Sequence, residues 1–219
     1  MRRKKLLREC ILLFIIVVVY TILTKVFDVA AVGPQNSEVG FSTINHYLAL
    51  KIGYNETFYQ ISKILGIIPF LLILYYGLIG LRQLIKRKSI LAVDQELLIL
   101  GCFYILVGIV YIFFEKVIIN YRPVMFDGLL EASYPSSHTM LALTIGLSSI
   151  LISKEYISNH KICIITNIIT WIVMIALVLT RLLSGVHWFT DIIGGVLISL
   201  FLVQLYRSSL EIAKKRKSR

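Results

Sequence analysis

Six apolar stretches, separated by short charged clusters, run through this sequence of 219 residues. A helix needs about 20 apolar residues to cross a hydrocarbon core of about 30 Å, and this alternation is typical of a chain that crosses a bilayer repeatedly. The sequence therefore predicts an all-α integral membrane protein, a six-transmembrane-helix bundle forming a single membrane domain over residues 1–219. We expect the spans at Cys10–Val32, Ile61–Leu81, Leu97–Phe114, His138–Ser153, Ile162–Thr180 and Thr190–Tyr206.

The composition excludes an ordinary soluble domain. Hydrophobic residues make up 58% of the chain and charged residues 16%, whereas soluble domains have about 45–50% and about 25%. The net charge of +11 would favour nucleic-acid binding in a soluble protein. In a membrane protein the placement of these charges matters more than their sum, and we expect no nucleic-acid partner.

The basic residues are distributed unevenly along the chain. Of the 23 Lys and Arg residues, 17 lie in residues 1–8, in the loops 82–88 and 154–161, and in the tail 207–219. Because six spans alternate in direction, these four segments lie on one side, which the positive-inside rule identifies as the cytoplasm. We expect a multi-pass protein of the cell (plasma) membrane, with both termini cytoplasmic and the polar residues 115–138 and 180–191 on the extracytoplasmic face.

The second of these polar segments contains Arg181, His187 and Asp191. If a helix begins near His187, residues four apart share a face, so that Asp191 accepts a hydrogen bond from one ring nitrogen and leaves the other as a nucleophile. Arg181 supplies a planar fork suited to phosphate oxygens. The alternative is that His187 and Trp188 lie at the membrane interface and Asp191 caps a helix.

The first polar segment offers complementary groups. Residues 135–138, Pro-Ser-Ser-His, precede an apolar helix, and the free backbone N–H groups of a helix start form an anion site. His138 in that first turn can donate a proton to a departing oxygen. Lys116 and Arg122 add two cations. The alternative for residues 135–138 is an ordinary helix cap.

Taken together, these groups describe a site for a multiply charged oxyanion that needs a nucleophile and an acid, which favours phosphoryl transfer. No Cys/His cluster has metal-ligand spacing, and we expect neither a metal nor a cofactor. The charge-free stretches 139–153 and 192–206 hold 15 residues each, roughly 22 Å of helix. Crossing the bilayer then requires one more turn, including His138 and residues 187–191. This depth, level with the headgroups, favours a lipid phosphate.

At these residues the sequence resembles the type 2 phosphatidic acid phosphatase superfamily, whose motifs run Lys-x6-Arg-Pro, Pro-Ser-Gly-His and Ser-Arg-x5-His-x3-Asp. The resemblance covers residues 97–206, with Thr180 in the Ser place of the third motif and Ser137 in the Gly place of the second. In the first motif, Lys116 and Arg122 have five residues between them instead of six, which rotates Lys116 by about 100° on a regular helix. Either the helix is distorted there or Arg122 does more of the work.

The resemblance implies a catalytic core over residues 97–206 and a role for each matching residue. His187 would be the nucleophile that forms a phosphohistidine, Asp191 its orienting partner, and His138 the acid that protonates the leaving group. Water would then cleave the phosphoenzyme without a metal. The residues that would bind the phosphate are Lys116, Arg122, Ser136, Ser137 and Arg181.

The expected function is therefore that of an integral membrane phosphatase acting on a lipid phosphomonoester or pyrophosphate. The resemblance implies undecaprenyl diphosphate, phosphatidylglycerol phosphate and phosphatidic acid as substrate types, with the lipid bilayer as the other partner. Two alternatives stay open: a lipid phosphotransferase of the same superfamily, and a non-enzymatic lipid transporter or scramblase. The sequence does not determine the oligomeric state.

One further segment has a pattern of its own. Residues 33–60 form a long outer loop with an amphipathic stretch around Phe41, Ile44, Tyr47, Leu48 and Leu50. Such a stretch either lies on the outer leaflet and gates lipid entry or packs on the bundle as a connector.

Overall fold

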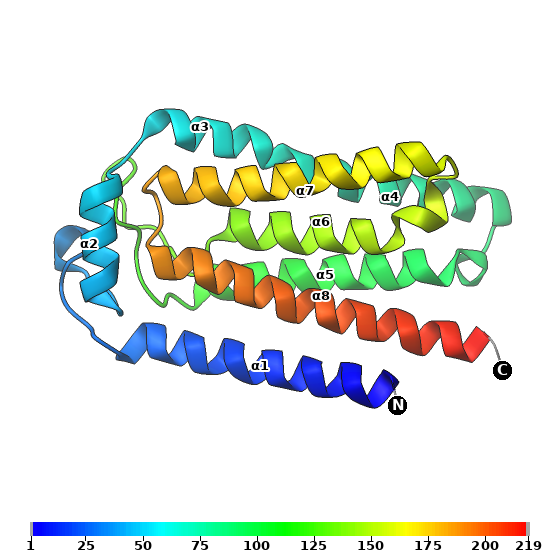
Figure 1. Ribbon diagram of the computed structural model, residues 1–219, viewed down its shortest axis with the longest axis horizontal. Coiled ribbons are helices and arrows are strands. Elements are labelled where there is room, and N and C mark those ends of the chain that lie inside the picture. Colours follow the sequence, from blue (N-terminus) through cyan, green and yellow to red (C-terminus); the bar gives the residue numbers. More distant parts are fainter. Residues whose placement is uncertain (1, 218–219) are drawn as a thin grey trace.

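The computed structural model describes residues 2–217, which fold into a bundle of α-helices (Figure 1). No β-strand occurs in this part of the chain. Two short 3-10 turns, Pro34–Asn36 and Ile90–Ala92, lie in the connections. The helices are α1 (Arg2–Val26), α2 (Ser42–Ile52), α3 (Glu56–Leu65), α4 (Ile67–Arg87), α5 (Gln95–Lys116), α6 (Ser137–Tyr156), α7 (His160–Leu183) and α8 (Phe189–Lys217).

Five helical segments among the described residues are long and apolar enough to cross a membrane. They are Lys4–Val26, Glu56–Arg87, Gln95–Lys116, His160–Leu183 and Phe189–Lys214. The prediction of an all-α membrane protein is therefore confirmed. The predicted span His138–Ser153, which lies in α6, is not among the five, so that this criterion does not give the predicted count of six.

The position of α6 explains why it is less apolar. This helix lies in the middle of the bundle and packs against α7 and α8, and also against α4 and α5 (Figure 1). Half of its 20 residues are buried, and they include Thr139, Thr144, Ser148, Ser149 and Ser153. A helix that is surrounded by protein does not need the apolar outer surface of a helix that faces lipid.

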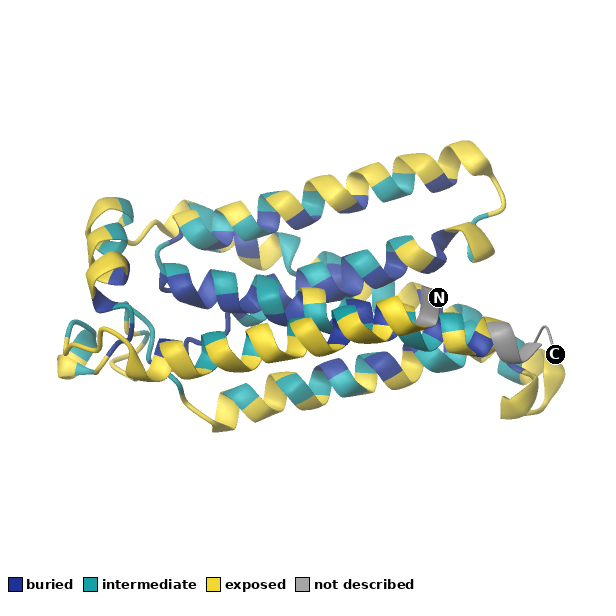
Figure 2. Ribbon diagram, turned by 60° about the horizontal axis from the view of Figure 1, so that its bottom comes forward, coloured by how far each residue is buried: buried dark blue, intermediate teal, exposed yellow. Residues whose placement is uncertain are grey.

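The surrounding helices show the opposite pattern. Figure 2 shows buried positions along their inner faces and exposed positions along their outer faces. Large apolar side chains are more than half exposed there, as for Leu12 on α1, Ile105 on α5 and Ile172 on α7. Such an extensive apolar exterior is incompatible with water and fits a hydrocarbon environment.

The observed helices differ from the predicted spans at their ends, and two of these differences change the path of the chain. The first helix ends at Val26 and not at Val32, because the chain turns back there and Ala30 pairs with Val39 in an isolated bridge. The second predicted span runs across the junction of α3 and α4 at Gly66. A Cβ atom at Gly66 would lie 2.9 Å from Cδ2 of His138, so that the glycine allows the two segments to approach closely.

The amphipathic stretch of the outer loop forms α2, which lies across the end of the bundle (Figure 1). It packs on α8 through Asn45, whose amide donates to Thr190 Oγ1 at 2.8 Å and accepts from the Thr190 backbone N–H at 3.2 Å. Ile44, Tyr47 and Leu50 remain exposed. The helix is therefore anchored to the bundle and also presents an apolar face; its part in lipid entry stays a prediction.

The contact between the α2–α3 connection and the end of α7 leads to a test of the fold. Gly185 follows α7 with a φ of +67°, and a Cβ atom there would lie 2.0 Å from the backbone oxygen of Gly53. We expect Gly185→Ala to lower the unfolding temperature in detergent further than Gly128→Ala does. Gly128 has a similar φ of +73° with nothing within 4 Å of its Cβ position, so this control isolates the backbone strain of about 1–2 kcal/mol. Equal losses of stability in the two variants would contradict the close packing.

Candidate active site

The site lies at the end of the bundle where α7 ends and α8 begins. Asp191 is the third residue of α8, and its carboxylate accepts the backbone N–H of Trp188 at 2.9 Å, as the third residue of a helix does in a reciprocal cap. The Asp191 backbone oxygen accepts the N–H of Ser136 at 3.0 Å. The start of α8 is thereby joined to the start of α6, which brings the second and third sequence motifs together.

His187 and Asp191 do not bond directly, contrary to the sequence-based expectation. Nδ1 of His187 lies 3.8 Å from Oδ2 of Asp191, beyond hydrogen-bond distance. The helix begins at Phe189, after His187, so the i, i+4 geometry of a helix does not apply to this pair. Instead, Ser133 Oγ lies 3.1 Å from His187 Nδ1 and donates to the Asp191 carboxylate. A buried serine thus connects the two residues.

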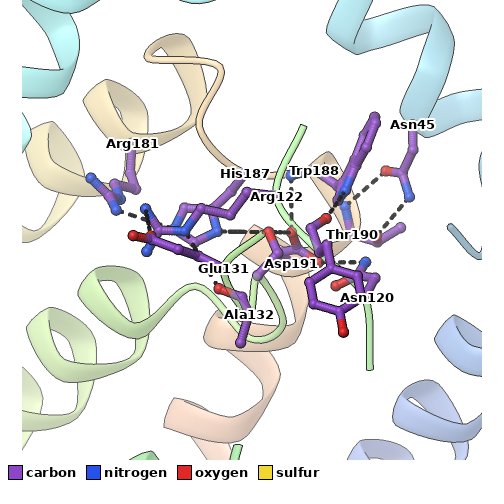
Figure 3. A network of polar contacts seen from close by, with 12 residues as sticks. Asn45, Asn120, Arg122, Glu131, Ala132, Arg181, His187, Trp188, Thr190 and Asp191 are labelled. Atoms are coloured by element: carbon purple, nitrogen blue, oxygen red, sulfur yellow. Dashed lines mark hydrogen bonds and ion pairs between the residues drawn. The ribbon is translucent and has the colours of Figure 1, made fainter. Parts of the chain in front are cut away.

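Asn120 provides the other support of Asp191. Its amide donates to Oδ1 of Asp191 at 3.1 Å (Figure 3). Asn120 and Ser133 face each other across the outer segment, where the Ser133 backbone N–H donates to the backbone oxygen of Asn120 at 3.0 Å. Sequence analysis missed both residues, since no motif spacing indicates them; the fold of residues 117–136 brings them to α8.

Arg181 approaches His187 from the other side (Figure 3). Its Nη2 lies 3.2 Å from His187 Nε2, and its Nη1 donates to Ser62 Oγ on α3 at 3.2 Å. The side chain is buried, with its Cζ 5.5 Å from the ring centre of Tyr59. Arginine only donates hydrogen bonds, so Nε2 carries a lone pair and Nδ1 carries the proton. The chain of donors then runs from Nδ1 to Ser133 and on to Asp191.

The electrostatic environment favours the neutral form of His187. Burial first, followed by the positive charges of Arg181 and Arg122, holds the pKa of this imidazole well below its ordinary value. Neutral histidine with an available Nε2 lone pair is the form that can act as a nucleophile. The geometry and the charges therefore support the same protonation state.

Arg122 is the second arginine of the site. It forms an ion pair with Glu131 at 3.2 Å, and its Nε donates to the Ala132 oxygen at 3.4 Å. Arg122, His187 and Ser137 line the same narrow cavity. The structure thus brings Arg122, Arg181 and His187 together, as predicted from the motifs.

The residues of the second motif border this cavity and a larger one. Ser136 precedes α6 and Ser137 is its first residue. Ser136 Oγ and Arg181 Nε are buried and have no hydrogen-bond partner within residues 2–217. Such atoms are costly in isolation, and they are the kind of donors that a phosphate satisfies. His138 lines an apolar cavity of about 330 Å³ between α4, α5 and α6, and Ser137 lines both cavities.

Lys116 is not brought into this network. It is the last residue of α5, it is exposed, and it makes no hydrogen bond or ion pair with the residues that the structure describes. The helix ends at Lys116, and Arg122 lies in the non-helical segment that follows, so the rotation expected for a regular helix does not apply to this pair. Its contact with phosphate stays a prediction. Residues 2–217 also contain no group of three or more His, Cys, Asp or Glu side chains placed to hold a metal ion.

The fold and the site together define an all-helical membrane protein with a buried histidine next to two arginines. The sequence profile of the PAP2 superfamily matches residues 67–213, and the chain belongs to this superfamily. The match confirms the resemblance inferred from the three motifs. It begins with α4, which extends the region beyond the predicted core of residues 97–206.

A solved structure has a similar fold. It is described as the first transmembrane PAP2 type phosphatidylglycerolphosphate phosphatase from Bacillus subtilis, and it superposes with a TM-score of 0.59. The alignment covers 92% of this chain and 96% of that chain at 18% sequence identity. A search of curated protein sequences finds no significant match.

The assigned state of His187 can be measured by NMR of histidine-labelled protein in detergent. We expect the Nδ1–H tautomer, with the imidazole remaining neutral as the pH falls below about 6.5, the ordinary pKa. Since the unfolded chain takes up this proton and the folded chain does not, the native state loses stability on acidification. In Arg181→Gln the pKa should rise, because one of the charges that lower it is gone. The signal is assigned by its loss in His187→Gln, and protonation of the wild type near pH 6.5 would contradict the assignment.

Proposed function

We propose that this protein is a membrane lipid phosphatase that cleaves a phosphomonoester or diphosphate through a phosphohistidine at His187. The observation that carries the proposal is the chain from Arg181 through His187 and Ser133 to Asp191. It presents an unprotonated Nε2 beside the Arg181 guanidinium, with Arg122 lining the same cavity as His187, and stabilises the positive charge that the imidazole acquires on attack. The substrate types are those the resemblance implies: undecaprenyl diphosphate, phosphatidylglycerol phosphate or phosphatidic acid.

The proposed reaction has two steps. Nε2 of His187 attacks phosphorus as the bond to the leaving oxygen breaks, and His138 gives its proton to that oxygen. Water then attacks the phosphohistidine, His138 takes a proton from the water, and phosphate is released. Because Arg181 Nη2 lies against Nε2, an incoming phosphate oxygen has to take over this donor before attack. Binding of the phosphate to Arg181 therefore also frees the Nε2 lone pair for attack.

The cavities among the helices support a lipid as substrate. The apolar cavity at His138 adjoins a second one between α4 and α5, and Ile73 and Tyr104 line both. Cβ positions at the glycines along this groove meet no heavy atom within 4 Å; these are Gly77, Gly80, Gly101 and Gly108. A hydrocarbon chain attached to a phosphate at His138 fits such a groove, whereas a water-soluble phosphate ester has no apolar chain to fill it.

The proposed membrane arrangement has six crossings, formed by α1, α4, α5, α6, α7 and α8. The first turn of α1 and the last turns of α8 lie at the same end of the bundle, opposite α2 (Figure 1). The site lies at the end where α2 packs on α8. With the basic segments on the cytoplasmic side, this arrangement supports cytoplasmic termini and an extracytoplasmic site.

The function is tested with purified protein in detergent with EDTA, offered long-chain lipid monophosphates and diphosphates. We expect release of inorganic phosphate, and a loss of about a thousandfold or more in His187→Ala, because the covalent step is removed. His160→Ala is the matched control, since His160 lies at the opposite end of α7. The phosphoenzyme should be stable in alkali and labile in acid, as phosphohistidine is.

The same assay separates the alternatives. Phosphate release that needs added Mg²⁺, or that survives His187→Ala, contradicts the mechanism. Transfer of the phosphoryl group to a second lipid without release of phosphate indicates a phosphotransferase. Lipid movement between leaflets without turnover indicates a transporter or scramblase.

The orientation is tested with reporters. A reporter that is active only in the cytoplasm should work when fused after Arg219, and one that is active only outside should work when inserted after Gly53, next to α2. The reverse result, or cytoplasmic activity at both positions, contradicts the proposed sidedness.

A further inference from the structure

Helix α3 lies outside the residues matched by the superfamily profile, yet it borders the site. It packs along α7 (Figure 1). Ser62 accepts a hydrogen bond from Arg181, and the Tyr59 ring lies beside the same guanidinium. Both contacts come from one face of α3, and neither was expected from the motifs.

The same face carries a lysine. Nζ of Lys63 lies 5.4 Å from the ring centre of Tyr59, the ring that Arg181 also approaches. Tyr59 in turn stacks on Phe126, with ring centres 5.2 Å apart, and Arg122 lies 5.9 Å from Phe126. Aromatic faces attract cations at such distances. Three positive side chains are therefore gathered around one stack of two rings.

Lys63 lies on the side of the proposed acid. A Cβ atom at Gly66 would contact Cδ2 of His138 at 2.9 Å and the Lys63 backbone oxygen at 3.2 Å, so the last turn of α3 lies directly against this imidazole. The Lys63 side chain extends from this turn of α3, whereas Arg181 contacts His187 itself. Arg181 therefore lies at the proposed nucleophile, and Lys63 is carried by the turn that borders the proposed acid.

The ammonium group of Lys63 is available for a ligand. The side chain is exposed, and its Nζ makes no hydrogen bond or ion pair with the described residues. A cation beside the acid stabilises a leaving group only weakly when that group departs as a neutral alcohol. It stabilises a leaving group that is itself an anion much more strongly, because the negative charge on that group increases as the bond breaks.

We propose that Lys63 binds the lipid-side phosphate of a diphosphate substrate and makes the protein selective for lipid diphosphates over lipid monophosphates. The inference rests on the proposed function. In this reaction Nε2 of His187 bonds to the terminal phosphorus, the bridging P–O bond breaks, and the His138 proton goes to the bridging oxygen. The product that departs is a lipid monophosphate, whose negative charge the Lys63 ammonium neutralises.

The test compares farnesyl diphosphate with farnesyl monophosphate, which share one hydrocarbon chain. We expect Lys63→Met to lower kcat/KM for the diphosphate about tenfold, equivalent to about 1.4 kcal/mol, and to change that for the monophosphate by less than about twofold. Lys63→Arg should keep the preference. Lys51→Met is the matched control, since Lys51 also lies over a tyrosine, Tyr47, at 4.9 Å, but on α2.

The outcomes distinguish a failure of the proposed phosphatase function from a failure of the proposed role of Lys63. If wild-type protein cleaves neither substrate, the proposed function fails. If it cleaves them but shows no preference for the diphosphate, or if Lys63→Met lowers both activities equally, the role of Lys63 is wrong. A preference that is lost in Lys116→Met and kept in Lys63→Met overturns the inference in favour of the first motif.

A measurement that needs no turnover complements these variants. Methylenediphosphonate, which has two phosphate-like groups and cannot be cleaved at its bridge, should compete with substrate more strongly than inorganic phosphate in the wild type. Lys63→Gln should lose this difference. An unchanged difference in this variant also overturns the inference.

Discussion

The site depends on the burial of an uncompensated positive charge. Arg181 is only 1% exposed, and a buried charge is expensive unless it has partners. Within residues 2–217 it makes no ion pair; its contacts are Ser62, Tyr59 and His187, all neutral. These contacts hold the guanidinium without cancelling its charge, which remains available to an anion. Arg122 differs, since Glu131 already pairs with it.

Asp191 connects the opposite end of the network to the fold. One carboxylate accepts the Trp188 N–H, the Ser133 hydroxyl and the Asn120 amide. It therefore ends the loop that carries His187, starts α8, and fixes the outer segment against both. The sequence suggests helix capping and orientation of the histidine as alternatives; in the structure Asp191 caps α8 directly and is connected to His187 only through Ser133.

How much the sequence predicts depends on how local each interaction is. Arg181, His187 and Asp191 are spaced along one short segment, and the motifs identify them together with His138. Ser133 and Ser62 cannot be found this way, because they reach the site through the path of residues 117–136 and through α3 packing on α7. The helical-bundle class follows from hydropathy. The hydropathy of α6 is too low for the helix to be counted as a membrane span, because the other helices shield it from lipid. The close approach at Gly66 is also a tertiary feature, since a Cβ atom there would meet His138, which is distant in sequence.

The superfamily profile divides the chain into matched residues and a preceding part that includes α3. The residues matched by the superfamily profile begin at 67 and contain the groups to which the proposed reaction assigns attack, proton transfer and phosphate binding: His138, His187, Asp191, Arg122 and Arg181. Helix α3 precedes them, and through Ser62 and Tyr59 it holds the Arg181 guanidinium that contacts Nε2 of His187. The helix also carries Lys63 beside Tyr59, the group that we propose to bind the leaving phosphate. In the proposed reaction the shared chemistry therefore resides in the matched core, and selectivity among phosphorylated lipids arises from the helix packed against it.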